Sequence, residues 1–198
     1  MTDMQDQIGF ILCLDHEQAI GITIVTCEFL YFNYAKAKVR PCKLVPVTAT
    51  GQVLDQRPQS ITQVIEVQNR ESRTVTYVVV NSDCYIDVFA LDISGGVPAV
   101  VHVKKLKAQA DTICGNLEEP STFYISMKNF VLFATINTFG EQKVTLSELK
   151  IKYSDDKGDK TTALRHTFLK ADTITSSTDS YLAIAYVTSD QEHFNLSI

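Results

Sequence analysis

The feature that most constrains this chain is a recurring pair of short apolar segments separated by a polar turn. The four copies begin at Gly21 (GITIV-TCE-FLYFNYAKA), Thr76 (TYVVV-NSDC-YIDVFALDI), Asn129 (NFVLFATINTFGEQKVTLSELKI) and Ser180 (SYLAIAYVTSDQEHFNLSI), 51 to 55 residues apart. Short runs rich in β-branched and aromatic residues, bounded by turn residues, are typical of β-strands. No segment keeps the i, i+3, i+4, i+7 spacing of a long amphipathic helix. We therefore expect an all-β chain in which each pair is an antiparallel hairpin.

The segments between the pairs repeat as well. Leu-Lys-Ala followed by Asp-Thr-Ile occurs in Val100–Ile113 and again in Ala163–Ser176, each time ahead of the next pair. Each unit of roughly 50 residues thus reads as four short antiparallel strands. One such sheet cannot bury both of its faces alone, so units of this kind stack in sets. We expect residues 1–198 to form a single all-β domain with four blade-like units.

These units resemble the blades of β-propeller proteins, and those of the WD40-like group most closely. A strand such as YLAIAY, a tight turn and a strand such as HFNLSI follow one another as in a blade. Phe89-Ala90, Ser147-Glu148 and Phe194-Asn195 stand where the signature dipeptide is expected. The chain departs from the family pattern because it has no Trp, no Gly-His pair, and a period longer than about 40–45 residues. The resemblance implies a β-propeller or part of one; a β-sandwich or jelly roll, which also has short strands separated by turns, is the alternative.

The net charge and the cysteine content indicate which binding partners and which cellular compartment to expect. Lys and Arg total 18 against 23 Asp and Glu, and this net charge of -5 gives no reason to expect binding to nucleic acid. No apolar window reaches the ~18 residues of a membrane span, and Asp3 and Asp6 stand where a signal peptide would be basic. The five cysteines are irregularly spaced without C-x-x-C, which favours reduced thiols in a cytoplasmic or nuclear protein.

Motifs for catalysis and cofactor binding are missing from the sequence. There is no G-x-S-x-G elbow, no H-E-x-x-H and no glycine-rich phosphate loop, so we expect no catalytic residues, metal or cofactor. Asp15-His16-Glu17 is the densest titratable cluster, and a solvated turn explains it better than acid–base chemistry because adjacent strand residues point to opposite faces. The acidic run Asp155-Asp156-Lys157-Gly158-Asp159 lacks EF-hand spacing and favours a hairpin loop.

The fold resemblance and the missing motifs together favour a non-catalytic protein–protein interaction scaffold that binds partners through loops and strand edges. Residues on expected loops or edges are the candidate partner contacts: Arg57, Gln59, Lys104, Lys105, Asp155 and Asp156. Lysines such as Lys104 and Lys105 can also serve to protect an exposed strand edge from aggregation. The alternative function is that of a self-assembling, coat-like structural β-sandwich, motivated by the many strand edges.

Overall fold

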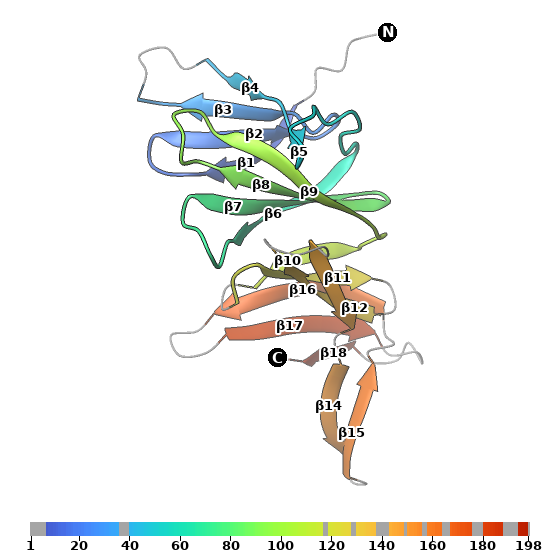
Figure 1. Cartoon of the computed structure of the whole chain (residues 1–198). Helices are drawn as coiled ribbons and strands as arrows, with labels where there is room; N and C mark the ends of the chain where they lie inside the picture. The colour runs from blue at the N-terminus through green and yellow to red at the C-terminus, as the bar shows by residue number, and fades with distance from the viewer. Residues whose placement is uncertain are drawn as a thin grey trace. The chain divides into compact units, whose positions relative to one another are not determined.

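The computed structural model describes residues 7–35, 40–116, 119–127, 130–137, 143–148, 150–155, 158–163, 167–175, 180–187 and 194–197. Every helix or strand in these ranges is a β-strand, so the all-β prediction is confirmed for this part of the chain (Figure 1). The chain divides into two compact units, Met1–Ala108 and Gln109–Ile198. The single domain with four blade-like units stays a prediction.

The described residues of the first unit form two sheets. One is a four-stranded antiparallel sheet in the order β1-β2-β3-β4, formed by β1 (Ile8–Cys13), β2 (Gln18–Thr23), β3 (Phe29–Asn33) and β4 (Cys42–Leu44). The other has the order β5-β9-β8-β7-β6 and is formed by β5 (Val47–Thr48), β6 (Ile61–Gln68), β7 (Val75–Ser82), β8 (Tyr85–Asp92) and β9 (Ala99–Lys107). The short β5 pairs parallel to β9, and the remaining neighbours pair antiparallel.

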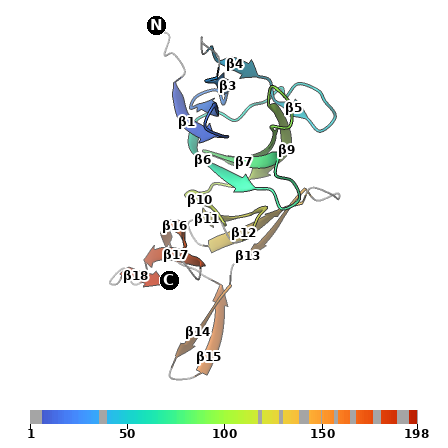
Figure 2. The same cartoon turned by 90° about the vertical axis from the view of Figure 1, so that its left-hand side faces the viewer.

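The described residues of the second unit form three antiparallel sheets. The four-stranded sheet consists of β10 (Thr112–Gly115), β11 (Thr122–Met127), β12 (Phe130–Ile136) and β13 (Val144–Glu148). A two-stranded hairpin of β14 (Lys150–Asp155) and β15 (Gly158–Ala163) follows (Figure 2). The last sheet consists of β16 (Thr167–Thr175), β17 (Ser180–Val187) and β18 (Phe194–Ser197).

The recurring sequence pairs correspond to recurring structure. They form the hairpins β2-β3, β7-β8, β12-β13 and β17-β18, each antiparallel and each in a different sheet. In every case one further antiparallel strand precedes the hairpin, which gives the three-stranded meanders β1-β2-β3, β6-β7-β8, β11-β12-β13 and β16-β17-β18. No sheet among the described strands closes on itself. The propeller and the sandwich therefore both stay predictions.

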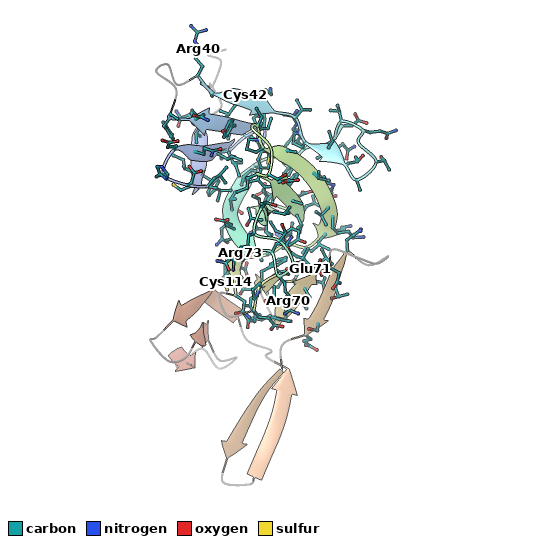
Figure 3. The ribbon with its side chains drawn as sticks, turned by 60° about the vertical axis from the view of Figure 1, so that its left-hand side comes forward. Arg40, Cys42, Arg70, Glu71, Arg73 and Cys114 are labelled. Carbon is teal, nitrogen blue, oxygen red and sulfur yellow. The ribbon has the colours of Figure 1, made fainter. Side chains whose placement is uncertain are left out.

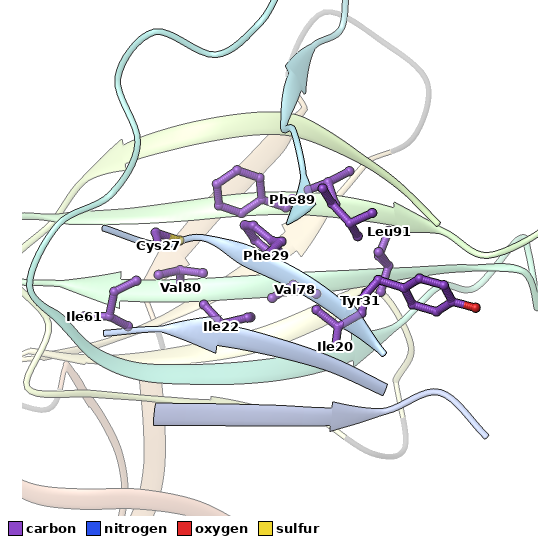
Figure 4. Close-up of a cluster of buried hydrophobic side chains, with 12 residues drawn as sticks. Ile20, Ile22, Cys27, Phe29, Tyr31, Ile61, Val78, Val80, Phe89 and Leu91 are labelled. Carbon is purple, nitrogen blue, oxygen red and sulfur yellow. The ribbon is translucent and has the colours of Figure 1, made fainter. Parts of the chain in front are cut away.

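A hydrophobic core joins the two sheets of the first unit (Figure 4). The first sheet contributes Ile20, Ile22, Phe29, Tyr31 and Leu44, and the second contributes Ile61, Val78, Val80, Phe89, Leu91 and Val100. The rings of Phe29 and Phe89 meet edge to face, with their centroids 5.1 Å apart. Both side chains are completely buried, so this pair fixes the spacing of the two sheets at the centre of the core.

Candidate binding pocket

A polar pocket of about 490 Å³ lies within the first unit. It is lined by the loop that leads into β6, by the turn between β7 and β8 with the adjoining ends of both strands, and by one position of β9. Its lining residues are Asp55, Gln56, Arg57, Pro58, Gln59, Ser60, Ser82, Asp83, Cys84, Tyr85, Asp87 and Lys105. A concave site with several converging polar groups is the usual form of a ligand-binding site.

Strand alternation explains why these side chains face the pocket. Residues two apart in a strand share a face, so Tyr85 and Asp87 lie on the same side of β8 as Phe89 of the core. Lys105 is the partner of Asp87 in the register of β8 with β9. The pocket is thus the polar continuation of the face that carries the core.

The loop over the pocket is held by hydrogen bonds at its end. The backbone N–H of Ser60 donates to the carbonyl of Val25 at 3.3 Å, and that of Ile61 donates to the carbonyl of Ile24 at 2.9 Å. Ser60 has a φ of 54°, which is rare for a residue with a side chain. These bonds tie the loop to the turn between β2 and β3 and so maintain one wall of the pocket.

Asp87 is the most deeply buried charged group in the lining. Its side chain has no exposed surface, and its Oδ1 lies 2.8 Å from Nε2 of His102. The imidazole of His102 packs against the ring of Phe89, with centroids 5.2 Å apart. Oδ2 of Asp87 is also buried, yet it has no hydrogen-bond partner. A buried carboxylate oxygen without a donor costs free energy relative to its hydrated state.

Two cations line the pocket and each has a partner. The Lys105 ammonium lies 4.6 Å from the centroid of the Tyr85 ring, in cation–π geometry. Nη1 of Arg57 lies 3.8 Å from Oε1 of Glu28, a carboxylate that also binds the Lys43 ammonium. Contacts of this kind hold both cations on the pocket wall.

The structure brings together three of the six partner-contact residues predicted from the sequence. Arg57, Gln59 and Lys105 all line the pocket. Lys104 is exposed but directly precedes Lys105, so it lies on the opposite face of β9 and is not part of the lining. Asp155 is the last residue of β14, and Asp156 lies outside the described residues. Whether any of the six contacts a partner stays a prediction.

Sequence reasoning missed the residues that give the pocket its chemistry. Tyr85, which is 38% exposed at the pocket wall, is not among the six candidate contacts predicted from the sequence. Asp87 was not singled out at all. A signal for it exists, since Asp87 is the one charged residue within the apolar run YIDVFAL. A carboxylate at an inward position of a core strand needs a specific partner.

A smaller pocket of about 330 Å³ lies at the turn between β6 and β7. Arg70, Glu71 and Arg73 mark this turn (Figure 3). Of these three residues only Arg73 lines the pocket, together with Glu66 and Thr76 among others, and Oγ1 of Thr76 donates to Oε1 of Glu66 at 2.9 Å. No buried polar atom without a partner belongs to the described residues of this lining, so it makes a weaker candidate site.

Metal sites and membrane-spanning helices are both absent from the part of the chain that the structure describes. The described residues contain no group of three or more His, Cys, Asp or Glu side chains placed to hold a metal ion. They also include no helix long and apolar enough to cross a membrane. No protein-family model matches the chain, and the comparison with curated proteins found no similar sequence.

Proposed function

We propose that this protein is a non-catalytic interaction scaffold of blade-like β units, and that the pocket of its first unit binds a segment of a partner protein. The four consecutive three-stranded meanders support the repeat architecture. The face-to-face packing of two sheets in the first unit is the contact that neighbouring blades of a propeller make. Two sheets of a sandwich also pack in this way, so the alternative architecture is kept.

The observation that carries the binding proposal is the composition of the pocket. A partly exposed Tyr85, two cations and three carboxylates converge on it from separate segments. Tyr and Arg are enriched at protein interfaces because they combine a large contact area with directional hydrogen bonding. A loop and a turn carry Asp55, Arg57 and Asp83, and the strands β8 and β9 carry the others. Loops positioned by a rigid β scaffold commonly present a binding surface.

Cys84 offers a direct readout of occupancy. It is exposed and lines the pocket, whereas Cys13 and Cys42 are exposed outside the lining. Proteins captured from a cell extract would be purified and added back while the thiols are alkylated. A partner that binds here slows alkylation of Cys84 and leaves Cys13 and Cys42 unaffected. A captured protein that leaves the Cys84 rate unchanged contradicts the proposed pocket function.

A pair of variants separates pocket binding from general adhesion. Tyr85→Ala removes the aromatic wall, and Tyr34→Ala removes a tyrosine that is 53% exposed outside the lining. We expect Tyr85→Ala to weaken capture of the partner and Tyr34→Ala to leave it unchanged. Equal capture by both variants argues against the pocket as the binding site.

The alternative function, self-assembly as a structural protein, makes a different prediction for the chain alone. A self-assembling β-sandwich associates through its strand edges as concentration rises. Sedimentation over a wide concentration range distinguishes the two proposals. A monomer throughout supports the scaffold, and large homogeneous assemblies support the structural role.

A further inference from the structure

We propose that β1 is a pairing surface for a second copy of this chain, and that the two β1 strands lie antiparallel about a two-fold axis. The first sheets of the two copies then form one continuous sheet. This inference goes beyond the proposed pocket and does not depend on it. It is carried by a strand edge whose backbone groups, side chains and charges match those of its own copy when the strand is reversed.

β1 lacks the features that protect strand edges. It is the outermost strand in the order β1-β2-β3-β4, and its sequence, IGFILC, contains no charged residue. Among the described strands, every other sheet-edge strand of six residues or more contains Asp, Glu or Lys; these are β6, β14, β15 and β16. Ile8 is 41% exposed and Ile11 is 66% exposed. An exposed, uncharged apolar edge is a template for pairing with another strand.

The hydrogen bonds of the first sheet show which backbone groups of β1 lie on this edge. The backbone N–H of Leu14 donates to the carbonyl of Gln18 at 2.9 Å, across the turn between β1 and β2. Hydrogen-bonded and non-hydrogen-bonded pairs alternate along an antiparallel ladder. Leu12 therefore also directs its N–H and C=O toward β2, whereas Ile11 and Cys13 direct theirs toward the outer edge.

Ile11 and Cys13 determine the register of the proposed pairing. When the two-fold axis passes between the Leu12 residues of the two copies, Ile11 of each copy is opposite Cys13 of the other. Each of these pairs can exchange both of its N–H···O=C hydrogen bonds. This register uses the part of β1 that pairs regularly with β2, because the register irregularity lies between Ile8 and Phe10.

The side chains of β1 fit the same register. Phe10, Leu12 and Leu14 are half-buried and pack against the core of the first unit. In the dimer Leu12 meets its own copy, and Phe10 meets Leu14 of the second copy. The pairing thus continues the core that already joins the two sheets of this unit. On the other face the exposed Ile11 lies beside Cys13 of the second copy, which buries further apolar surface.

The charges next to β1 favour the antiparallel arrangement. Asp15 and Glu17 are exposed in the turn that follows β1. In the antiparallel dimer the two acidic turns lie at opposite ends of the paired strands, on the order of 20 Å apart at about 3.3 Å per residue. This separation exceeds the screening length of about 8 Å at physiological salt. A parallel pairing would place the two acidic turns side by side, where they repel one another.

The pairing is closed and weak. A two-fold axis uses the outer edge of β1 in both copies, so the assembly ends at a dimer. One short strand pair is a smaller contact than the interface of an obligate dimer, so we expect dimerisation to depend on concentration.

Sedimentation equilibrium of the full chain over a wide concentration range tests the pairing. We expect a reversible equilibrium between monomer and dimer. Ile11→Lys places a charge on the edge and should raise the dissociation constant of the dimer at least about tenfold. Val97→Lys is the matched control, because Val97 is 55% exposed between β8 and β9, and it should leave the constant unchanged. Circular dichroism checks that both variants fold.

Cys13 tests the register on the natural chain. In the proposed dimer the Cys13 residues of the two copies lie diagonally across the axis, about 7–8 Å apart. A bifunctional thiol reagent with a spacer of about 8 Å should therefore join them into a covalent dimer. Cys13→Ser should abolish this product, whereas Cys42→Ser and Cys84→Ser, which remove the other exposed thiols among the described residues, should not.

Four outcomes overturn the inference. These are a monomer at every concentration, equal dissociation constants for Ile11→Lys and Val97→Lys, assemblies that grow beyond a dimer, and a cross-linked dimer that persists in Cys13→Ser. A monomeric chain whose Cys13 is protected by another protein would show that the edge accepts a foreign strand instead of its own copy.

The pocket is tested separately from the pairing. Tyr85→Ala should weaken capture of the partner protein and leave the dimer intact. A chain that stays monomeric but captures its partner through the pocket overturns the pairing and leaves the scaffold function standing. A dimer that captures no partner has the reverse meaning.

Discussion

A hydrogen bond of 2.8 Å joins Nε2 of His102 in β9 to Oδ1 of Asp87 in β8. The two residues are not partners in the strand register, since Asp87 is opposite Lys105 and His102 is opposite Phe89. An irregularity in the pairing between Val88 and Phe89 lies between them. The contact is therefore diagonal across a β-bulge, a feature that often re-aims side chains at functional positions.

His102→Ala should destabilise the protein. The substitution leaves both oxygens of a fully buried carboxylate without a partner, which costs about 1–3 kcal/mol. The free energy of unfolding in urea measures the effect. His16→Ala is the matched control, because the side chain of His16 is 89% exposed and its loss should change stability by less than about 0.5 kcal/mol. Equal stability of the two variants would show that the buried bond contributes nothing.

Phe89→Ala should be more costly than any exposed apolar substitution in the first unit. Phe89 is fully buried against Phe29, and truncating a buried phenylalanine costs about 3–5 kcal/mol. Chemical unfolding followed by circular dichroism checks this value. Ile11→Ala provides the comparison, since Ile11 is 66% exposed. A loss below about 1 kcal/mol for Phe89→Ala would mean that the two sheets do not share this core.

Asp92 should make the stability of the protein fall at acid pH. The backbone N–H of Ser94 donates to its Oδ1 at 2.9 Å, and this bond together with one to the Ser94 side chain lowers the pKa of Asp92 below 3.8. The pKa of Asp92 is lower in the folded than in the unfolded protein. Its contribution to stability is therefore present at pH values above the unfolded-state pKa and is lost as the pH falls through the folded-state pKa.

Asp92→Asn is the variant that isolates this contribution, since it keeps an acceptor for Ser94 but does not titrate. We expect the difference in melting temperature between the natural chain and the variant to be constant near neutral pH and to change below about pH 4. A pH-independent difference would contradict the assignment.

Tyr124 should make the protein less stable at alkaline pH. Burial raises the pKa of its phenol above 10.0, with smaller contributions from Cys114 and Glu119. Because the pKa of Tyr124 is higher in the folded than in the unfolded protein, its contribution to stability is fully present at pH values below the unfolded-state pKa. This contribution is lost as the pH rises toward the folded-state pKa. In an absorbance titration, Tyr124→Phe should remove a phenol that ionises at higher pH than an ordinary tyrosine. Unfolding the natural chain should move the ionisation of that phenol to lower pH. The prediction is contradicted if the phenol lost in Tyr124→Phe is one that ionises at the pH of an ordinary tyrosine.

Much of the local structure follows from the sequence. All four recurring pairs form antiparallel hairpins; they begin at Gly21, Thr76, Asn129 and Ser180. Apolar runs rich in β-branched residues and broken by polar turns can bury an apolar face when they are extended as strands. The cluster Asp15-His16-Glu17 lies exposed between β1 and β2, as predicted for a solvated turn. β14 and β15 meet at Asp155 and Gly158, which confirms the predicted hairpin there.

Strands outside the recurring pairs carry a weaker sequence signal, because their side chains follow a mixed pattern. β6 (Ile61–Gln68) alternates apolar and polar residues imperfectly, with a register irregularity between Ile61 and Gln63. β11 (Thr122–Met127) contains Thr and Ser that are buried in the sheet. Such segments are held by pairing with neighbouring strands, which is a tertiary contribution that periodicity does not register.

The sequence by itself determined the strand content and the recurring hairpins, since both depend on residues close together in the chain. Only the tertiary structure decided the pocket, because Arg57, Asp87 and Lys105 come from three segments that the sheet and its loop bring side by side. The diagonal bond from His102 to Asp87 depends on strand register and on a bulge. A shift of one residue would turn Asp87 to the other face of the sheet, so its role is fixed by pairing rather than by local pattern.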